Sequence, residues 1–227
     1  TLLYNCYKAS CKVSGMEQVN MSVEAIQKIL NGESEVDSYE DHLLNSFEMP
    51  PYLTPIKQDS DAVRNFMTKW NINPDDVFYD IRQDRVVFPV YTEDNVLVDA
   101  VGRSLTKRQP KWLRYASSPV PYVYGTGDIG IVVEDAISAY AIGSMFPRLV
   151  GIALLGTQLT DFHKWYLAHH WDRLYIALDP DARDKTLRMT RDLSVYVPDV
   201  QALNITDDLK YMNEDDVTAL ENINNAQ

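Results

Sequence analysis

Short apolar runs alternate with helical patterns along the chain from Asp128 onward. Apolar residues recur at helical spacing in the intervals 135–146, 158–171 and 182–193. Around these intervals lie four apolar runs of strand length, GIVVE (130–134), LVGIALLG (149–156), RLYIALD (173–179) and SVYVP (194–198). Apolar strands that alternate with helices predict a parallel sheet covered by helices on both faces. The fold class expected for this region is therefore α/β.

A different pattern precedes this region. The segment AVRNFMTKW (62–70) places its apolar residues on one helical face and predicts a helix. The runs RVVFPVY (85–91) and VLVDAVG (96–102) flank a turn at Glu93-Asp94-Asn95 and predict an antiparallel pair of strands. A smaller α+β subdomain is therefore expected before the parallel sheet.

The two ends of the chain give weaker patterns. Ser22 precedes VEAIQKIL (23–30), which predicts a short helix. Residues 31–61 hold eight acids, one lysine and three prolines, which is typical of a linker or an extended segment. Near the other end, a helix is expected at Glu214–Leu220.

Acidic residues follow two of the apolar strands. Glu134 closes the first strand, and Asp179 and Asp181 close the third. Because ligands bind at the carboxyl ends of parallel strands, these three side chains are expected to converge at one edge. Carboxylates with little competing positive charge suit Mg²⁺. An acid between a strand and a helix is also a common helix N-cap, and this alternative stays open for Glu134 and Asp179.

The charge of the chain is unevenly distributed. Lys and Arg total 21 against 33 Asp and Glu, a net charge of −12, which excludes a protein that coats nucleic acid with its whole surface. Positive charge nevertheless gathers between Gly102 and Arg114, where no acid occurs, in Arg103, Lys107, Arg108, Lys111 and Arg114. Such a stretch is either a solvated loop or a phosphate-binding strip. Trp112 within it is either a core residue or a platform for a base.

Several protein classes are excluded by what the sequence lacks. Two cysteines are too few for a disulfide-rich secreted scaffold. There is no apolar run of about 18 residues, so no membrane span is expected. The sequence contains neither a P-loop nor a Gly-x-Ser-x-Gly elbow, which disfavours a P-loop ATPase and a serine hydrolase.

Four segments resemble, in order, the TOPRIM domain of bacterial and phage DNA primases. They are VVEDAISA (132–139), LLGTQLTDFHKWYL (154–167), YIALDPDARDKT (175–186) and ITDDLKYMNEDDV (205–217). They match a strand ending in glutamate, a Gly-Thr pair before a helix, an Asp-x-Asp motif, and an Asp-Pro-Lys segment before an acidic helix start, with Leu209 in place of the proline. Upstream, residues 86–105 and 109–115 are similar to a primase hairpin and to its Pro-Lys-Tyr-Leu motif.

The resemblance implies a TOPRIM-like sheet and a phage-encoded DNA primase that makes short RNA primers by metal-dependent nucleotidyl transfer. Mg²⁺ or Mn²⁺ would be held by Glu134, Asp179, Asp181 and Asp208. The five basic residues between 103 and 114 would bind the single-stranded DNA template and ribonucleoside triphosphates. The implied partner is a replicative helicase, and the implied location is the cytoplasm, that of the host cell for a phage protein.

The expected organisation has five parts. They are the back half of a zinc ribbon (1–21), a helix and acidic linker (22–58), a basic primase subdomain (59–125), a TOPRIM domain (126–210) and a C-terminal helix and tail (211–227). Cys6 and Cys11 resemble the second half of a primase zinc ribbon and would supply two of the four ligands of Zn²⁺. Two ordinary reduced cysteines are the alternative.

Two residues depart from the family pattern. Asp135 stands where the family usually has glycine, and Ser138 where it has a further acid. These departures favour one rival hypothesis, a catalytically degenerate TOPRIM used for docking. A second rival is a TOPRIM nuclease, which shares the carboxylates. A phosphatase with an Asp-x-Asp nucleophile is disfavoured, because that pair belongs on the first strand of its domain.

Overall fold

The computed structural model describes residues 2–5, 14–17, 46–56, 60–156 and 158–226. The chain divides into two compact units, Thr1–Asp41 and His42–Gln227. In the first unit, β1 (Leu2–Asn5) pairs antiparallel with β2 (Ser14–Glu17). Cys6, Cys11 and the helix expected at 23–30 lie outside the described residues, so the zinc-ribbon prediction stays a prediction.

The second unit begins with an antiparallel sheet of five strands in the order β3-β4-β5-β6-β7. These strands are β3 (Leu53–Pro55), β4 (Phe78–Asp80), β5 (Arg85–Tyr91), β6 (Leu97–Ser104) and β7 (Trp112–Arg114). The helix α3 (Asp61–Trp70) and a 3-10 turn, η1 (Pro74–Asp76), lie between β3 and β4. The antiparallel pair expected from the sequence is confirmed, since β5 and β6 pair from Arg85 opposite Ser104 onward.

The second sheet has the order β12-β11-β9-β10-β8. Its strands are β8 (Tyr122–Tyr124), β9 (Ile129–Val133), β10 (Leu149–Ala153), β11 (Arg173–Ile176) and β12 (Asp199–Ala202). All neighbours are parallel except β8, which runs antiparallel to β10 at the edge. The mixed α/β class and the parallel sheet expected from the alternating pattern are therefore confirmed.

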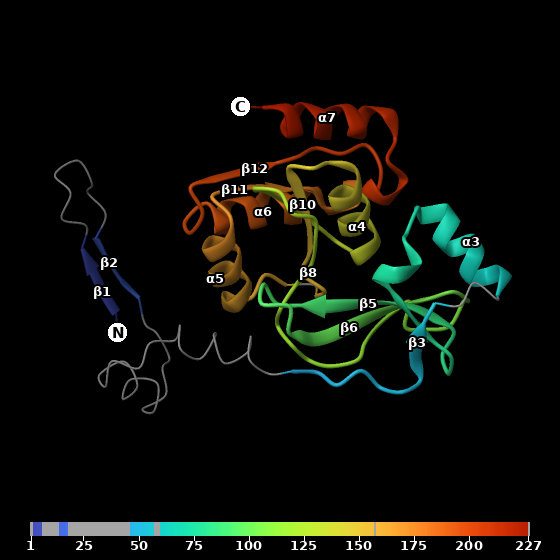
Figure 1. Ribbon diagram of the computed structural model, residues 1–227. Coiled ribbons are helices and arrows are strands. Elements are labelled where there is room, and N and C mark those ends of the chain that lie inside the picture. The colour runs from blue at the N-terminus through green and yellow to red at the C-terminus, as the bar shows by residue number, and fades with distance from the viewer. Residues whose placement is uncertain (1, 6–13, 18–45, 57–59, 157, 227) are drawn as a thin grey trace. The chain divides into compact units, whose positions relative to one another are not determined.

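Helices connect the strands of this sheet. They are α4 (Ala136–Met145), α5 (Asp161–His170) and α6 (Arg183–Leu193), followed after β12 by η3 (Leu209–Tyr211) and α7 (Glu214–Asn225). Because crossovers between parallel strands are right-handed, α4 covers one face while α5 and α6 cover the other (Figure 1). The backbones of α4 and β10 pack so closely at Gly151 that only glycine fits there, because a Cβ on Gly151 would lie 2.0 Å from the Ala139 carbonyl oxygen.

One strand is displaced from its expected position. The apolar run 194–198 predicted the last strand, but it forms a turn in which Tyr196 and Val197 donate backbone hydrogen bonds to the Leu193 carbonyl. Val195 is 78% exposed, so its apolar side chain does not mark a core strand. The actual strand, β12, is an edge strand with polar positions, and its first residue Asp199 forms an ion pair with Arg173 on β11. The prediction was wrong because edge strands need no continuous apolar run.

Side chains join the two sheets into one body. The Tyr124 and Tyr140 hydroxyls both donate to Asp76, at 2.6 and 2.7 Å, which links η1 to β8 and α4. The Phe88 ring of β5 meets the Tyr122 ring of β8 edge-on, with centroids 5.7 Å apart. These contacts fix the antiparallel sheet beside the parallel-rich one.

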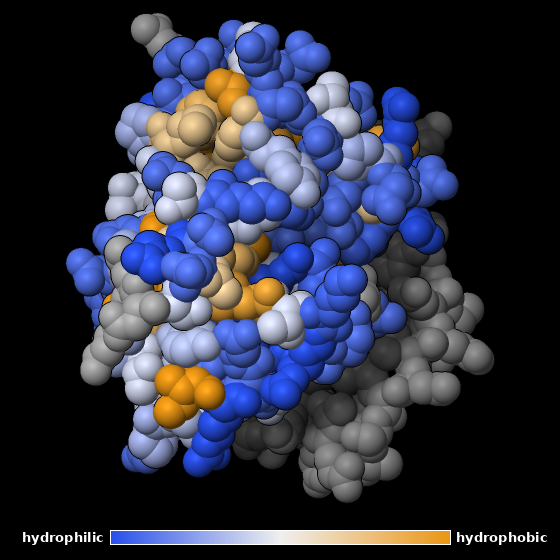
Figure 2. All heavy atoms as spheres, turned by 90° about the vertical axis from the view of Figure 1, so that its right-hand side faces the viewer, coloured by the Kyte–Doolittle hydropathy of each residue, from blue (hydrophilic) through white to orange (hydrophobic). Residues whose placement is uncertain are grey.

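The surface is mostly polar where it can be seen. On the face that carries α3, hydrophilic residues dominate and apolar ones gather only in small areas (Figure 2). Among the described residues, no helix combines the length and the apolar character needed to cross a bilayer.

Candidate active site

Three acids lie at the carboxyl edge of the parallel strands. Glu134 follows β9 directly, and Asp179 follows β11 by three residues. The strands β9 and β11 are neighbours with Ile176 opposite Val132, and the ladder continues as the Ala177 amide donates to the Val132 carbonyl at 2.9 Å. The two strand ends therefore bring Glu134 and Asp179 to the same edge, as the sequence pattern predicted.

Helix capping does not account for these acids. The N-cap of α4 is Asp135, whose Oδ1 accepts the amides of Ile137 and Ser138 at 3.0 Å each. Asp179 precedes the 3-10 turn η2 (Pro180–Ala182), but its side chain accepts no capping hydrogen bond. Among the described residues, no side chain forms an ion pair with Glu134, Asp179 or Asp181.

The pKa of the Asp179 carboxyl is raised by its surroundings, which include the other acids of this edge. Burial raises the pKa of the Asp179 carboxyl, and the negative charge of Glu134 raises it further. Asp135 and Asp181 add smaller repulsions, while the ammonium of Lys210 opposes them. Asp179 therefore lies in a region of incompletely neutralised negative charge, and a cation would stabilise its ionised form.

A second group of charged residues lies beside the first. Lys210, in η3, contacts the carboxylates of both Asp135 and Asp208. The Ser138 hydroxyl donates to Asp208 at 2.8 Å and lies 3.2 Å from Asp135. Asp208, a predicted metal ligand, is thus already in contact with a lysine.

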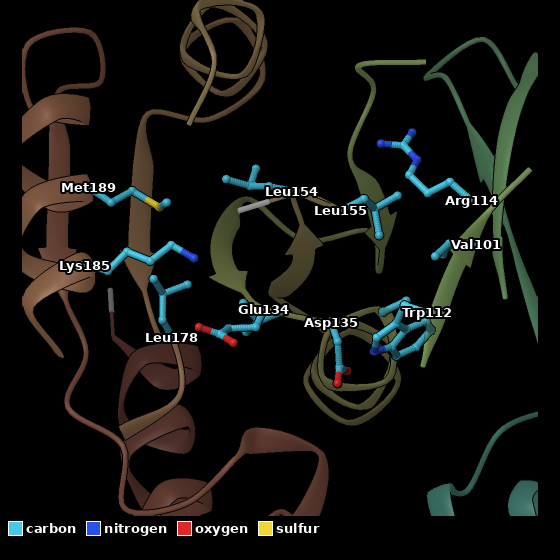
Figure 3. Close-up of a pocket in the computed structure, with 13 residues that line it drawn as sticks. Val101, Trp112, Arg114, Glu134, Asp135, Leu154, Leu155, Leu178, Lys185 and Met189 are labelled. Carbon is cyan, nitrogen blue, oxygen red and sulfur yellow. The ribbon is translucent and has the colours of Figure 1, made fainter. Parts of the chain in front are cut away.

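A cavity of about 320 Å³ opens between the two sheets. Glu134 and Asp135 lie on one side of it, with Val101, Trp112 and Arg114 of the antiparallel sheet opposite (Figure 3). Lys185 of α6 points into the cavity toward Leu178, and Met189 lies one turn away (Figure 3). Much of the lining is apolar, so the cavity offers an acidic rim beside a hydrophobic wall.

Arg103 and Lys111 carry positive charge toward the acidic edge. Burial lowers the pKa of Arg103, an effect that Asp135 and Tyr211 oppose. Its guanidinium lies 5.2 Å from the centre of the Trp112 ring, and its buried Nη1 has no hydrogen-bond partner among the described residues. Burial also lowers the pKa of Lys111, as do Arg103 and Lys210, and Asp179 opposes this. Both cations therefore interact electrostatically with acids of this edge, Arg103 with Asp135, and Lys111 with Asp135 and Asp179.

The other predicted cations differ in their surroundings. Lys107 and Arg108 are exposed in the loop between β6 and β7. Arg114, by contrast, forms an ion pair with the fully buried Asp99 and donates to the Ser118 carbonyl. The charge of Arg114 is therefore engaged within the protein, whereas those of Lys107 and Arg108 face solvent.

Sequence reasoning missed two lysines of the site. Lys210 stands at the lysine of the Asp-Pro-Lys pattern matched to primases, so the resemblance contained the signal, although no role was assigned to the lysine from the sequence. Lys185 lies in the first turn of α6, shortly after the Asp-x-Asp motif, and only this nearness in the sequence could have drawn attention to it. Both positions are visible in the sequence, but their partners are not.

The side chains fit a divalent cation of the Mg²⁺ type only in part. In the described ranges, no group of three or more His, Cys, Asp or Glu side chains is arranged to hold a metal ion. Mg²⁺, however, is commonly bound by one or two carboxylates together with waters and substrate phosphates. The charge around Asp179 and its carboxylate neighbours meets that requirement, so the donor chemistry fits an ion whose shell the substrate completes.

No protein-family model and no curated protein match this chain. Several solved structures, however, are similar to it. The zinc-binding and RNA polymerase domains of the Aquifex aeolicus primase match at 20% identity and a TM-score of 0.51, over 89% of this chain and 49% of that one. A DnaG primase catalytic domain bound to single-stranded DNA matches at 17% identity and a TM-score of 0.52, over 91% and 73%.

The E. coli primase catalytic core matches at 16% identity and a TM-score of 0.50, over 87% of this chain and 72% of that one. The chain spans about half the length of the Aquifex fragment and nearly three quarters of the catalytic cores. The resemblance drawn from the motifs is confirmed at the level of structure: this chain has the fold of a DnaG-type primase catalytic core.

Proposed function

We propose that this protein is a DNA primase that synthesises short RNA primers on single-stranded DNA. The observation that carries the proposal is the set of unpaired carboxylates, Glu134, Asp179 and Asp181, at the carboxyl edge of the parallel strands. Two cations lie near enough to interact electrostatically with acids of this edge, Arg103 with Asp135, and Lys111 with Asp135 and Asp179. Nucleotidyl transfer requires carboxylates that can bind a metal ion and, near them, cations that can bind the phosphates of the substrate.

In this mechanism, Glu134, Asp179 and Asp181 would hold Mg²⁺ or Mn²⁺. The bound ion would lower the pKa of the attacking hydroxyl and stabilise charge on the leaving pyrophosphate. Arg103 and Lys111 bind the triphosphate, since both lie within electrostatic reach of the acidic edge. The Trp112 ring, 5.2 Å from the Arg103 guanidinium, would support that side chain from one side.

The remaining partners follow from the same proposal. The exposed Lys107 and Arg108 bind the phosphates of the template strand. Cys6 and Cys11 supply two ligands of a Zn²⁺ site, and a replicative helicase delivers the template. The protein acts in the cytoplasm, that of the host cell if a phage encodes it.

The replacement Asp179→Ala tests the proposal. It removes the carboxylate at the centre of the acidic edge, so primer synthesis from ribonucleotides on single-stranded DNA should fall by at least about 100-fold. The far-UV circular dichroism spectrum should stay unchanged, because Asp179 has no capping role. Asp184→Ala, at an exposed position of α6, is the matched control and should retain synthesis. Undiminished synthesis by the Asp179 variant would refute the assignment.

A docking module is the second candidate, and one observation favours it. Lys210 contacts two of the five acids near this edge, Asp135 and Asp208, and no closed three-residue metal cluster exists among the described residues. A chain that binds neither Mg²⁺ nor Mn²⁺ in calorimetry would support docking. A nicking assay beside the primer assay would identify the nuclease alternative.

A further inference from the structure

The side chain of Lys210 is held between two acids. It is only 8% exposed, and both Asp135 and Asp208 are 14% exposed. Its Nζ lies 3.4 Å from Asp135 Oδ2 and also contacts Asp208 Oδ2. The ammonium therefore bridges the N-terminus of α4 and the start of η3.

The four carboxylate oxygens of this pair are all occupied. Oδ1 of Asp135 caps α4, and its Oδ2 faces Lys210. Oδ1 of Asp208 accepts the Ser138 hydroxyl and the Lys210 amide, at 2.8 and 3.3 Å, and its Oδ2 contacts the ammonium. Every oxygen of the pair already has a partner within the protein, and a divalent ion at either Oδ2 would have to compete with the ammonium of Lys210.

The acids at the tips of β9 and β11 differ in this respect. Among the described residues, none donates a side-chain hydrogen bond to Glu134, Asp179 or Asp181, and none forms an ion pair with them. Lys210 nevertheless lies near enough to Asp179 and to Lys111 to influence both electrostatically. Its charge therefore acts both on the acidic edge and on the basic stretch.

We propose that Lys210 is a built-in counter-ion that closes the Asp135–Asp208 pair to divalent cations. This inference rests on the proposed function in one respect, which is that the unpaired acids bind a divalent ion. The wild-type protein then binds one such ion, at Asp179 and its carboxylate neighbours. Lys210 is a positioning residue, because it acts through the two carboxylates that it holds together.

Removing the ammonium should open a second ion site. Two largely buried carboxylates without a counter-ion repel each other, and an uncompensated buried charge is strongly destabilising. Oxygen ligands of this kind are those that Mg²⁺ and Mn²⁺ prefer. A divalent ion can therefore take the place of the ammonium once the lysine is gone.

The experiment counts bound Mn²⁺ ions on the full chain by electron paramagnetic resonance and by calorimetry. The wild type should bind one ion and Lys210→Ala two, while Lys210→Arg, which keeps the charge, should bind one. Asp208→Asn combined with Lys210→Ala should return the count to one, because the pair then has a single carboxylate. Lys164→Ala, which removes a lysine paired with the exposed Asp161 outside the site, is the control and should bind one.

Thermal unfolding gives a second readout that does not depend on activity. Mn²⁺ should raise the melting temperature of Lys210→Ala by more than that of the wild type, because ions bound only to the native state stabilise it. A Lys210→Ala chain that is unfolded without metal and folds on adding Mn²⁺ supports the proposal. One that stays unfolded in Mn²⁺ while the double variant folds overturns it, since the ion would then be unable to replace the ammonium.

The counts separate failure of this inference from failure of the proposed function. Two ions on the wild type, or one ion on both the wild type and Lys210→Ala, overturn the role of Lys210 and leave the primase proposal standing. No ion on the wild type and one on Lys210→Ala support the role of Lys210 and contradict a metal-dependent primase. No ion on either protein overturns both.

Discussion

The antiparallel sheet and the carboxyl edge of the parallel strands both carry charged side chains, but the contacts of those charges differ. Arg85 in β5 is fully buried and donates to the carbonyls of Gly102, Pro110 and Lys111. The buried Asp99 in β6 accepts Arg114 and the amides of Ala100 and Ala116. At the parallel edge, Asp179 has no such partner and has a raised pKa.

The difference separates charges that are neutralised by contacts within the fold from carboxylates that remain available to a ligand. Buried polar groups are normally hydrogen-bonded, and Arg85 and Asp99 follow that rule, whereas the buried Nη1 of Arg103 has no partner among the described residues. Arg85 donates to carbonyls at both ends of the basic loop (residues 103–111). It therefore helps to hold the backbone of Lys111 in position. An incompletely neutralised carboxylate with a perturbed pKa is typical of a functional site. The contact pattern, more than the charge itself, therefore distinguishes the two regions.

Breaking the Asp99 contacts should have the largest effect on stability. Asp99→Ala removes the partner of Arg114 and leaves the amides of Ala100 and Ala116 without their acceptor. Loss of one member of a buried ion pair should lower the free energy of unfolding by about 3–5 kcal/mol. Urea denaturation followed by circular dichroism measures the change.

Asp61→Ala is the matched control for that experiment. It breaks an ion pair with Arg64 in which both side chains are largely exposed, so the denaturation midpoint should hardly change. Equal midpoints for Asp99→Ala and the wild type would contradict the view that this ion pair belongs to the framework.

A smaller effect is expected where the antiparallel sheet meets solvent. Lys107→Ala with Arg108→Ala removes two exposed cations of the basic loop, so single-stranded DNA should bind several-fold more weakly. Each lost phosphate contact on a single strand reduces the salt dependence of log K by about 0.7, so the pair should reduce it by about 1.4. Fluorescence anisotropy at several salt concentrations measures the slope.

Arg188→Ala with Arg191→Ala is the control, because it removes two exposed arginines of α6 and keeps the net charge equal. It should leave the slope unchanged. If both double variants reduce the slope equally, binding reflects overall charge and the loop has no specific role.

Local pattern predicted the α-helices of the second unit and its most apolar strands, but it did not predict β3, β4, β7 or β8. The strand 85–91 has the bounds expected from its apolar residues, and the alternation after Asp128 predicted three of the four strands in that stretch. The prediction of the fourth strand was wrong because β12 lies at the edge of the sheet. Its position is set by pairing with β11, and an apolar run in the sequence does not mark it. Patterns thus identify elements with buried faces better than those that depend on one neighbour.

The site was predictable in its acids and less so in its cations. The parallel ladder brings Glu134 and Asp179 to one edge, as strand order alone implied. Arg114 and Asp99 are fifteen positions apart in the sequence, and the contact between Lys210 and Asp135 spans 75 positions. Whether a cation is already paired with an acid depends on tertiary contacts. The sequence alone therefore could not show which cations between 103 and 114 are paired within the protein and which are free to bind a ligand.

The smallest expected effect is a gain in stability from neutralising Asp179. Because the folded state raises the pKa of Asp179 above its unfolded value, folding favours the protonated acid, and this contribution is lost as pH rises through the folded pKa. Asp179→Asn mimics the neutral acid, so in EDTA at pH 7 its free energy of unfolding should exceed that of the wild type. The gain should shrink as pH falls toward the unfolded pKa of about 3.9.

Urea denaturation at pH 7 and pH 5 measures this gain, with the exposed Asp184→Asn as a control that should show none. Adding Mg²⁺ should stabilise the wild type and not Asp179→Asn, because an ion bound at the unpaired acids compensates the repulsion that asparagine removes. An Asp179→Asn chain less stable than the wild type in EDTA would show that this carboxylate is a framework charge, like Asp99. The contrast between the two sheets would then no longer hold.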